Sequence, residues 1–183
     1  MTEFERLKET HVSTKEIFDG DILHIIKDDI LLPNNKPATR EMILHVGAVC
    51  IVAVTDDNKL IMERQFRYPI GDVITEIPAG KLDSKKEEPL LAAKRELKEE
   101  TGYTADTWTN LGIFYPAPAY SDEAITLFMA RDLHKGDQNL DSDEFLDVSL
   151  IPIEDLVKEV MAGNIPDAKT QMGILRVARI LGI

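Results

Sequence analysis

Short apolar runs separated by polar turns follow one another through most of the chain, and this pattern predicts a protein rich in β-strands. The clearest run covers residues 47–55, which are almost continuously apolar and are typical of a buried strand. The turn Asp56-Asp57-Asn58 separates this run from a partner strand at 59–66. Further strands are expected at 72–77, 108–115, 124–132 and 146–150.

The first 45 residues form a separate group in this pattern. Residues 1–12 are polar with a weak helical period, and Asp19-Gly20 is a dipeptide typical of β-hairpins. Strands are expected at 16–18, 21–32 and 39–45. Because three strands of this length make a poor core alone, we expect residues 1–45 to form a small antiparallel subdomain that packs on the rest of the chain or on a second subunit.

Three helices complete the pattern. Residues 89–101 consist mainly of strong helix formers, and two more helices are expected at 153–162 and 167–181. Asp167 suits the N-cap of the last helix. The order of strands, helix, strands and helices predicts an α+β protein, in which residues 46–183 form a main domain with a mixed sheet sandwiched between helices.

Charge and cysteine content narrow the classes of partner and compartment. The 183 residues include 21 basic and 33 acidic side chains, and the net charge is −12. This balance disfavours binding to nucleic acid or an anionic membrane, and an anionic substrate would need a local basic pocket or metal ions. The single cysteine, Cys50, lies in an apolar run and is interpreted as a small buried residue. With no disulfide, signal peptide or membrane-spanning run, we expect a cytoplasmic protein.

The most informative stretch is an acidic helix. Pro89 suits its first turn, and Gly102 suits the position just past its end. Glu96 and Glu100 are four residues apart, so both side chains lie on one helix face, with Glu99 beside them. Like charges at this spacing repel unless water solvates them or a cation gathers them, and Mg²⁺ is a hard cation that prefers carboxylate ligands. A solvated acidic face is the alternative interpretation.

The residues around these glutamates resemble the Nudix box, the signature G-x5-E-x7-R-E-U-x-E-E-x-G-U of the Nudix hydrolases, where U is a bulky apolar residue. The run from Arg95 to Tyr103 matches this signature in register, and Glu87 precedes it at the required spacing. Six residues instead of five separate Gly80 from Glu87, so one residue is inserted in the turn Asp83-Ser84-Lys85-Lys86. Loops accept insertions at low cost. The resemblance implies the Nudix α/β/α sandwich.

The resemblance also implies Mg²⁺-dependent hydrolysis of a pyrophosphate, in which the cation neutralises the phosphates and activates a water. The implied metal ligands are Glu96, Glu100 and the backbone carbonyl of Ala79. Glu99 is either a third ligand or a group that orients the water, and Arg95 is expected to pair with a carboxylate of the box. The sequence leaves open whether Mn²⁺ replaces Mg²⁺.

Outside the box, the chain is similar to the ADP-ribose pyrophosphatase branch of the family from about residue 15 to about residue 175. Pro118 lies 16 residues after Gly102, as does the proline of a Ser-Pro-Gly loop in that branch, although both flanking residues are alanine here. A plain turn is the alternative interpretation of Pro118.

The same resemblance implies the residues that bind the substrate. Arg40 and Arg67 would meet the phosphates or the terminal ribose through their planar guanidinium groups. Glu41 and Glu76 would accept hydrogen bonds from the base or sugar, and Phe18 would stack on the adenine. Alternatively, Phe18 is a core residue of its hairpin, and Arg40 and Glu41 form a charge pair on an exposed face.

An acidic loop at 140–145 supplies a further carboxylate. In the branch, a glutamate of this loop closes over the site and orients or deprotonates the attacking water. Its position relative to the box makes Glu144 the candidate, with Asp143 as the alternative because the loop alignment can differ by one residue. Taken alone, the run would be interpreted as a solvated loop.

The resemblance therefore predicts a cytoplasmic Nudix hydrolase that cleaves ADP-ribose to AMP and ribose 5-phosphate. It also implies a homodimer in which N-terminal strands exchange between subunits and lend residues to the partner's site. Two alternatives stay open: hydrolysis of another nucleoside diphosphate derivative such as a nucleotide sugar, and a module that binds ADP-ribose without cleaving it. All three box glutamates are present, which favours catalysis.

Overall fold

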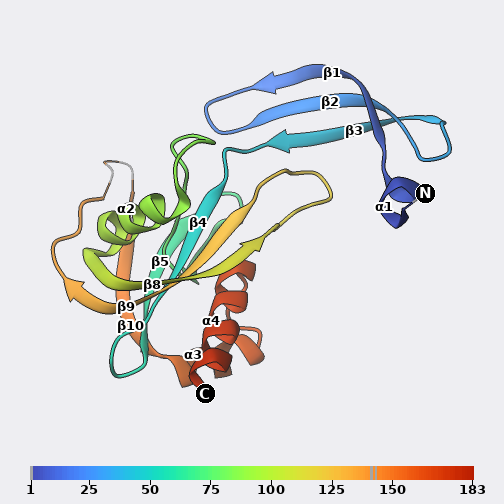
Figure 1. The fold of residues 1–183 in the computed structure, drawn as a ribbon. Helices are drawn as coiled ribbons and strands as arrows, with labels where there is room; N and C mark the ends of the chain where they lie inside the picture. Colours follow the sequence, from blue (N-terminus) through green and yellow to red (C-terminus); the bar gives the residue numbers. More distant parts are fainter. Residues whose placement is uncertain (1, 141, 143) are drawn as a thin grey trace. The chain divides into compact units, whose positions relative to one another are not determined.

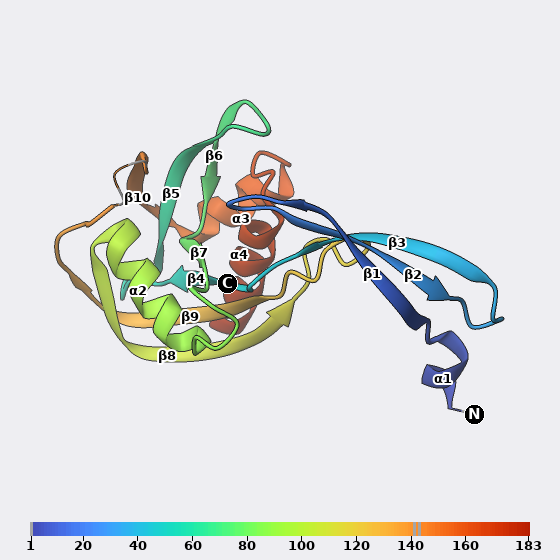
Figure 2. The same ribbon diagram turned by 90° about the horizontal axis from the view of Figure 1, so that it is seen from above.

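The chain folds into two compact units. The computed structural model describes residues 2–140, 142 and 144–183. The first unit contains the residues up to Val46 together with Ala117–Ala124, and the second contains Gly47–Pro116 and Ile125–Ile183. The colours of Figure 1 and the top view of Figure 2 allow the chain to be followed through each unit.

The first unit is built on a three-stranded antiparallel sheet of order β1-β2-β3. A short helix precedes it, and the bounds are α1 (Glu3–Leu7), β1 (Thr10–Asp19), β2 (His24–Leu31) and β3 (Pro37–Leu44). The expected N-terminal antiparallel subdomain is therefore present as a sheet. The segment Ala117–Ala124 is joined to it, since the Ile43 N–H donates to the Tyr120 carbonyl at 2.8 Å and the Asp122 N–H donates to the Ile43 carbonyl at 3.2 Å.

The strand β1 is longer than the sequence pattern predicts, because it begins at Thr10 and not at Glu16. It pairs with β2 from Thr10 opposite Leu31 to Asp19 opposite His24. Every residue of β1 is exposed, so no alternation of apolar and polar residues marks its first half. Backbone pairing defines this part of the strand, together with side-chain hydrogen bonds from Ser13 to Asp29 at 2.9 Å and from Thr14 to Asp28 at 2.6 Å.

The second unit contains two sheets, with strand orders β10-β5-β6 and β7-β4-β9-β8. The bounds are β4 (Ala48–Ala53), β5 (Lys59–Arg67), β6 (Asp72–Glu76), β7 (Ala79–Lys81), β8 (Tyr103–Phe114), β9 (Ile125–Lys135) and β10 (Leu146–Pro152). The pairing of β4 with β9 is parallel and the other pairings are antiparallel, which makes the larger sheet mixed.

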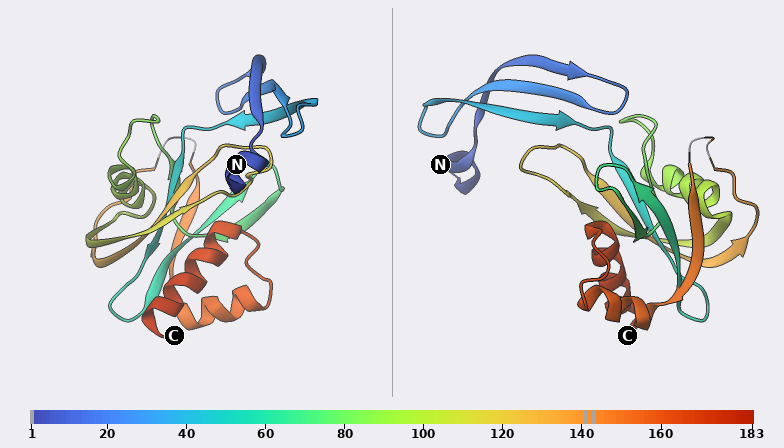
Figure 3. Two further views of the ribbon diagram at one scale, coloured as in Figure 1. Left: turned by 45° about the vertical axis from the view of Figure 1, so that its right-hand side comes forward. Right: turned by 180° about the vertical axis from the view of Figure 1, so that it is seen from behind.

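Helices cover both faces of β4. The bounds of these helices are α2 (Pro89–Thr101), α3 (Ile153–Met161) and α4 (Ala168–Leu181). Val49 and Ile51 pack in a cluster with Leu97 of α2, whereas Cys50 and Val52 belong to a second cluster with side chains of α3 and α4. Figures 2 and 3 show α2 on one side of the strands and α3 and α4 on the other. The predicted α/β/α sandwich with a mixed sheet is therefore confirmed.

The helix boundaries follow their capping residues. Pro89 is at the start of α2, and Gly102 ends it in the left-handed conformation, with φ of 76°. Asp167 caps α4 by accepting a hydrogen bond from the Thr170 N–H at 2.9 Å. Among the residues that the structure describes, no helix combines the length and the apolar character needed to cross a membrane.

One face of α2 holds it on the sheet. Ala92, Ala93 and Leu97 are fully buried, while Leu91 on the same helix is 61% exposed. Because the buried face fixes the rotation of the helix about its axis, it also fixes the directions in which the glutamates of its last turns point.

We predict that Leu97→Ala lowers the free energy of unfolding by about 2–5 kcal/mol, because it leaves a cavity under α2. Leu91→Ala is the matched control in the same helix, and its effect should stay within about 0.5 kcal/mol since its side chain is exposed. Urea unfolding followed by circular dichroism measures both. Equal losses in the two variants would contradict the packing of α2 described above.

Candidate active site

The three glutamates of α2 occupy different environments. Glu100 is only 6% exposed, the Glu96 side chain is mostly buried, and Glu99 is the most accessible of the three. A face of solvated surface charge would expose all three equally. The interpretation as an ordinary solvated acidic face is therefore wrong for Glu96 and Glu100.

Glu100 fixes the end of α2 to β7. Its Oε2 accepts a hydrogen bond from the Ala79 N–H at 3.0 Å. Burial, followed by the nearby charges of Glu63 and Glu96, raises the pKa of Glu100 to about 10. The carboxylate is thus held beside the backbone of Ala79, in surroundings that disfavour its negative charge.

Gly80 allows the same close approach for Glu96. A Cβ atom added at Gly80 would overlap the carboxylate of Glu96. The absence of a side chain at this position lets the carboxylate lie directly against β7. Burial raises the pKa of Glu96, and the neighbouring Arg95 opposes this shift.

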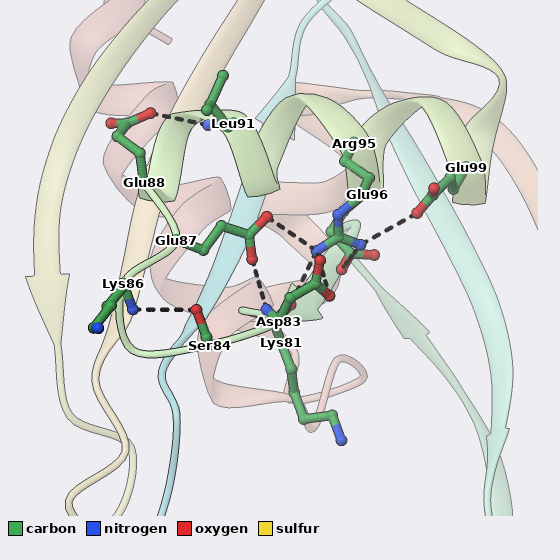
Figure 4. Close-up of polar contacts among 10 residues, drawn as sticks. All are labelled: Lys81, Asp83, Ser84, Lys86, Glu87, Glu88, Leu91, Arg95, Glu96 and Glu99. Atoms are coloured by element: carbon green, nitrogen blue, oxygen red, sulfur yellow. Dashed lines mark hydrogen bonds and ion pairs between the residues drawn. The ribbon is translucent and has the colours of Figure 1, made fainter.

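Arg95 connects the carboxylates of the box (Figure 4). Its Nη1 donates to Glu96 Oε1 at 2.8 Å and to Glu99 Oε2 at 3.2 Å. Its Nη2 lies 3.6 Å from a carboxylate oxygen of Asp83 and 3.6 Å from one of Glu87. Burial opposes the charge of Arg95, but these carboxylates outweigh it and raise the pKa of the guanidinium. The expected pairing of Arg95 with a carboxylate of the box is therefore present.

The one-residue insertion is taken up by the turn before α2. The Glu87 N–H donates to the Ser84 carbonyl at 3.1 Å, and the Lys86 N–H donates to Ser84 Oγ at 3.3 Å. The Glu87 carboxylate closes the turn by accepting from the Asp83 N–H at 2.6 Å. Figure 4 shows Glu87 still facing Arg95. The inserted residue thus leaves the ion pair between Glu87 and Arg95 in place.

A second group of charges lies on β5, β6 and the first turn of α4. Glu76 is buried and accepts from Arg67 Nε at 2.6 Å through Oε2, and from Lys169 Nζ through Oε1. Lys169 Nζ is also 3.0 Å from the carboxylate of Asp167. Both oxygens of Glu76 therefore have a cationic partner.

Glu63 lies directly opposite Glu76 across the β5–β6 pairing and lacks such partners. It is 4% exposed, and its Oε1 has no hydrogen-bond partner among the described residues. Burial and the charge of Glu76 raise the pKa of Glu63 to about 8, although Arg67 and Lys169 oppose this shift.

Glu144 interacts electrostatically with the same group of charges. The charge of Glu144 contributes to the raised pKa of Glu63, of Glu96 and of Glu100. Its carboxylate therefore lies within electrostatic range of the box glutamates. The alternative candidate, Asp143, lies outside the described residues.

These carboxylates fit a hydrated divalent cation. Within the part of the chain that the structure describes, no three acidic, His or Cys side chains form a group close enough to hold a metal by themselves. Mg²⁺, however, usually keeps several waters and takes only one or two carboxylates together with substrate phosphates. The unpaired Oε1 of buried Glu63 and the raised pKa of Glu100 both indicate negative charge in excess of the local cations.

Four residues predicted to bind substrate belong to the first unit. Phe18 is 53% exposed on β1, so its interpretation as a hairpin core residue is wrong. Arg40 Nε donates to Glu9 Oε2 at 3.0 Å, and Glu41 pairs with Lys27 at 3.3 Å across β2 and β3. Pro118 lies in the segment joined to β3.

A hollow of about 460 Å³ opens on one face of this first sheet. Its lining combines two lysines, two isoleucines and two acidic residues: Lys15, Ile17, Ile25, Lys27, Asp29 and Glu41. Glu41 is the one predicted substrate residue in this lining.

Glu63 and Lys169 were not predicted as site residues from the sequence. Glu63 follows the apolar residues 60–62 inside a strand, so a charged residue at an inward position was the available signal. Lys169 had no local signal, because only the packing of α4 brings it to Glu76.

Comparison with known proteins identifies the family. A family model for the NUDIX domain matches residues 44–170, which is more than half of the chain. The chain belongs to the Nudix family. This membership agrees with the box residues on α2 and with the sandwich that positions them.

Individual relatives are similar to almost the whole chain. An ADP-ribose pyrophosphatase of Bacillus subtilis is 44% identical over 170 residues, which span 92% of this chain and 91% of the relative. A methanol dehydrogenase activator of Bacillus methanolicus is 38% identical over 91% of both chains. The crystal structure of an ADP compounds hydrolase matches with a TM-score of 0.83 and 24% identity, covering 96% of this chain and 95% of that chain, and shows the same fold.

The raised pKa of Glu63 predicts a pH dependence for the metal-free protein. Between its ordinary value of 4.5 and about 8, the native state binds a proton that the unfolded state has released, so stability falls as pH rises through this window. The negative charges of Glu76 and Glu144 add to burial in raising the pKa of Glu63, whereas the positive charges of Arg67 and Lys169 lower it.

We expect the Tm measured in a chelator to fall from pH 5.5 to pH 8, by more in the wild type than in Glu63→Gln. A Tm that rises through this window in the wild type would contradict the assigned direction of the shift.

Proposed function

We propose that the chain is a Mg²⁺-dependent ADP-ribose pyrophosphatase that produces AMP and ribose 5-phosphate. The observation that carries the proposal is the placement of Glu96 and Glu100 against the backbone of β7 at Ala79 and Gly80. The Bacillus subtilis relative, which is named an ADP-ribose pyrophosphatase, supports the choice of substrate.

In this proposal the metal is held by the carboxylates of Glu96 and Glu100 and by the carbonyl of Ala79. When bound, Mg²⁺ neutralises the pyrophosphate and supplies an activated water. Arg95 fixes the Glu96 carboxylate through its hydrogen bond of 2.8 Å, so this ligand is oriented before substrate arrives. Glu99 shares the same guanidinium and either joins the ligands or orients the water.

Glu144 is the proposed residue that orients or deprotonates the attacking water. This role is supported by the charge of Glu144, which contributes to the raised pKa of both Glu96 and Glu100. When the cation is bound, its positive charge offsets the negative charges of the neighbouring carboxylates, so Glu144 can act as a base beside them.

Arg67 is the proposed substrate contact for which the second unit gives direct support. Arg67 is partly exposed while held by Glu76, so its remaining N–H groups can meet a phosphate oxygen. Phe18, Arg40, Glu41 and Pro118 remain proposed contacts to the nucleoside and ribose, by resemblance to the ADP-ribose pyrophosphatase branch.

We also propose a cytoplasmic homodimer in which residues 1–45 form the dimerisation subdomain and exchange strands with the partner. The first unit exposes large apolar side chains at Val12, Ile17 and Ile22. Covering such apolar side chains with a second protein surface stabilises an assembly. The single cysteine is compatible with a reducing compartment.

A substrate panel tests the proposed activity. With Mg²⁺, we expect ADP-ribose to be cleaved to AMP in preference to nucleotide sugars, dinucleotides and nucleoside triphosphates, with product release followed by chromatography. Glu100→Gln should abolish turnover while ADP-ribose binding is retained, and Glu144→Gln should lower kcat by about 10²–10⁴-fold.

The panel separates the alternatives. Preferential cleavage of a nucleotide sugar would support the proposed metal centre but contradict the assigned substrate contacts. Tight ADP-ribose binding with no turnover of any compound would identify a binding module.

Light scattering tests the proposed assembly. We expect twice the chain mass at micromolar concentration, because the exposed apolar side chains of β1 are covered by the partner. Removal of residues 1–45 should reduce the particle to one chain. A full-length monomer at that concentration would refute the dimer.

A further inference from the structure

Glu63 occupies a position where a carboxylate is costly. It continues the fully buried run Leu60, Ile61 and Met62 on β5 and is itself 4% exposed. An apolar side chain here would extend the buried run without desolvating a charge. Burying an ionised or unpaired polar group lowers stability, so a glutamate at this position needs a compensating partner.

The neighbouring residues do not supply that partner. The two cations of the group, Arg67 and Lys169, donate their hydrogen bonds to Glu76. Glu63 is directly opposite Glu76, and like charges at such positions repel. Its Oε1 has no hydrogen-bond partner among the residues described.

The surroundings of Glu63 connect it with the acidic site on α2. Its charge acts on Glu100, whose Oε2 is held by the Ala79 N–H at 3.0 Å, and Glu144 acts on both Glu63 and Glu100. Glu63 is therefore a buried carboxylate with one unpaired oxygen, within electrostatic range of the centre that the proposed function assigns to a divalent cation.

We propose that Glu63 is an additional acidic residue of the divalent-cation centre, whose Oε1 accepts a hydrogen bond from a water of hydration of the cation. This inference rests on the proposed function. Glu63 acts through the cation and not on the substrate, so it is a positioning residue.

Indirect binding accounts for the spacing of the carboxylates. No three described acidic side chains form a group close enough to enclose a bare metal ion. A cation that keeps part of its hydration shell spans a wider space, and Mg²⁺ loses its waters reluctantly. A buried carboxylate that accepts from such a water strengthens metal binding, as partners in the second coordination sphere commonly do.

Metal binding measured without turnover tests the role of Glu63. Chelator-treated wild-type protein and Glu63→Gln are titrated with Mn²⁺ by calorimetry, in the absence of nucleotide. We expect the Kd of Glu63→Gln to be about 10–100-fold higher, because the amide has the shape but not the charge of the carboxylate. The matched control is Glu154→Gln, which removes an exposed carboxylate from α3 and should leave the Kd unchanged.

A second variant covers the case in which Glu63→Gln fails to fold. Glu63→Asp keeps the charge but withdraws the oxygen by one methylene, and it should raise the Kd by a smaller factor. An unchanged Kd in whichever of the two variants folds would overturn the role of Glu63.

The failure of this inference and the failure of the proposed function give different results. If the wild type binds Mn²⁺ and Glu100→Gln does not, the proposed centre stands, and a wild-type Kd in Glu63→Gln removes only the inference. If the wild type binds no Mn²⁺, both the proposed metal centre and the role of Glu63 in it are refuted.

Discussion

The burial of several carboxylates beside one another is the constraint on which the second unit depends. Each buried glutamate must be compensated, because an isolated charge in the interior is strongly disfavoured. Glu96 has Arg95, Glu100 has the Ala79 N–H, and Glu76 has two cationic side chains. Among the buried side-chain oxygens of the described residues, Oε1 of Glu63 alone lacks a hydrogen-bond partner. These partners compensate the carboxylates only in part, since the pKa values of Glu63, Glu96 and Glu100 are all raised.

The scaffold creates this arrangement by packing that is independent of the charges. The strand β4 sends alternate side chains to two apolar clusters, so helices are held on both of its faces. The buried side chain of Leu97 holds α2 on the sheet. The carboxylate of Glu96 then lies against β7 at Gly80, which has no side chain to block it. A rigid apolar framework therefore sets the distance between the helix carboxylates and the backbone of β7, which a flexible loop could not do.

Local sequence patterns predicted the parts of the structure that are local. Pro89 and Gly102 marked the ends of α2, and the box resemblance predicted that Arg95 pairs with one of its carboxylates. The first half of β1 escaped prediction, because a strand exposed along its whole length has no apolar alternation.

The polar residues that were missed have a different explanation. Glu63 meets Glu76 through the register of β5 with β6, and Lys169 reaches Glu76 across 93 residues of sequence through the packing of α4. Neither contact has a local pattern, so only the folded chain could reveal that the box glutamates share their surroundings with a second acidic group. The one-residue insertion at the surface turn is a local change, and it leaves the ion pair between Glu87 and Arg95 in place.

Stability and ligand binding are governed here by the same electrostatics. Buried carboxylates that repel one another destabilise the metal-free native state, and they take up protons to relieve the repulsion. A cation that binds only the native state offers the alternative relief, displaces those protons and stabilises the fold by mass action. Replacing Glu63 by an apolar residue would therefore stabilise the metal-free native state but lower its affinity for the cation. A trade of this kind is expected where a functional site, and not the core, determines which residue occupies a buried position.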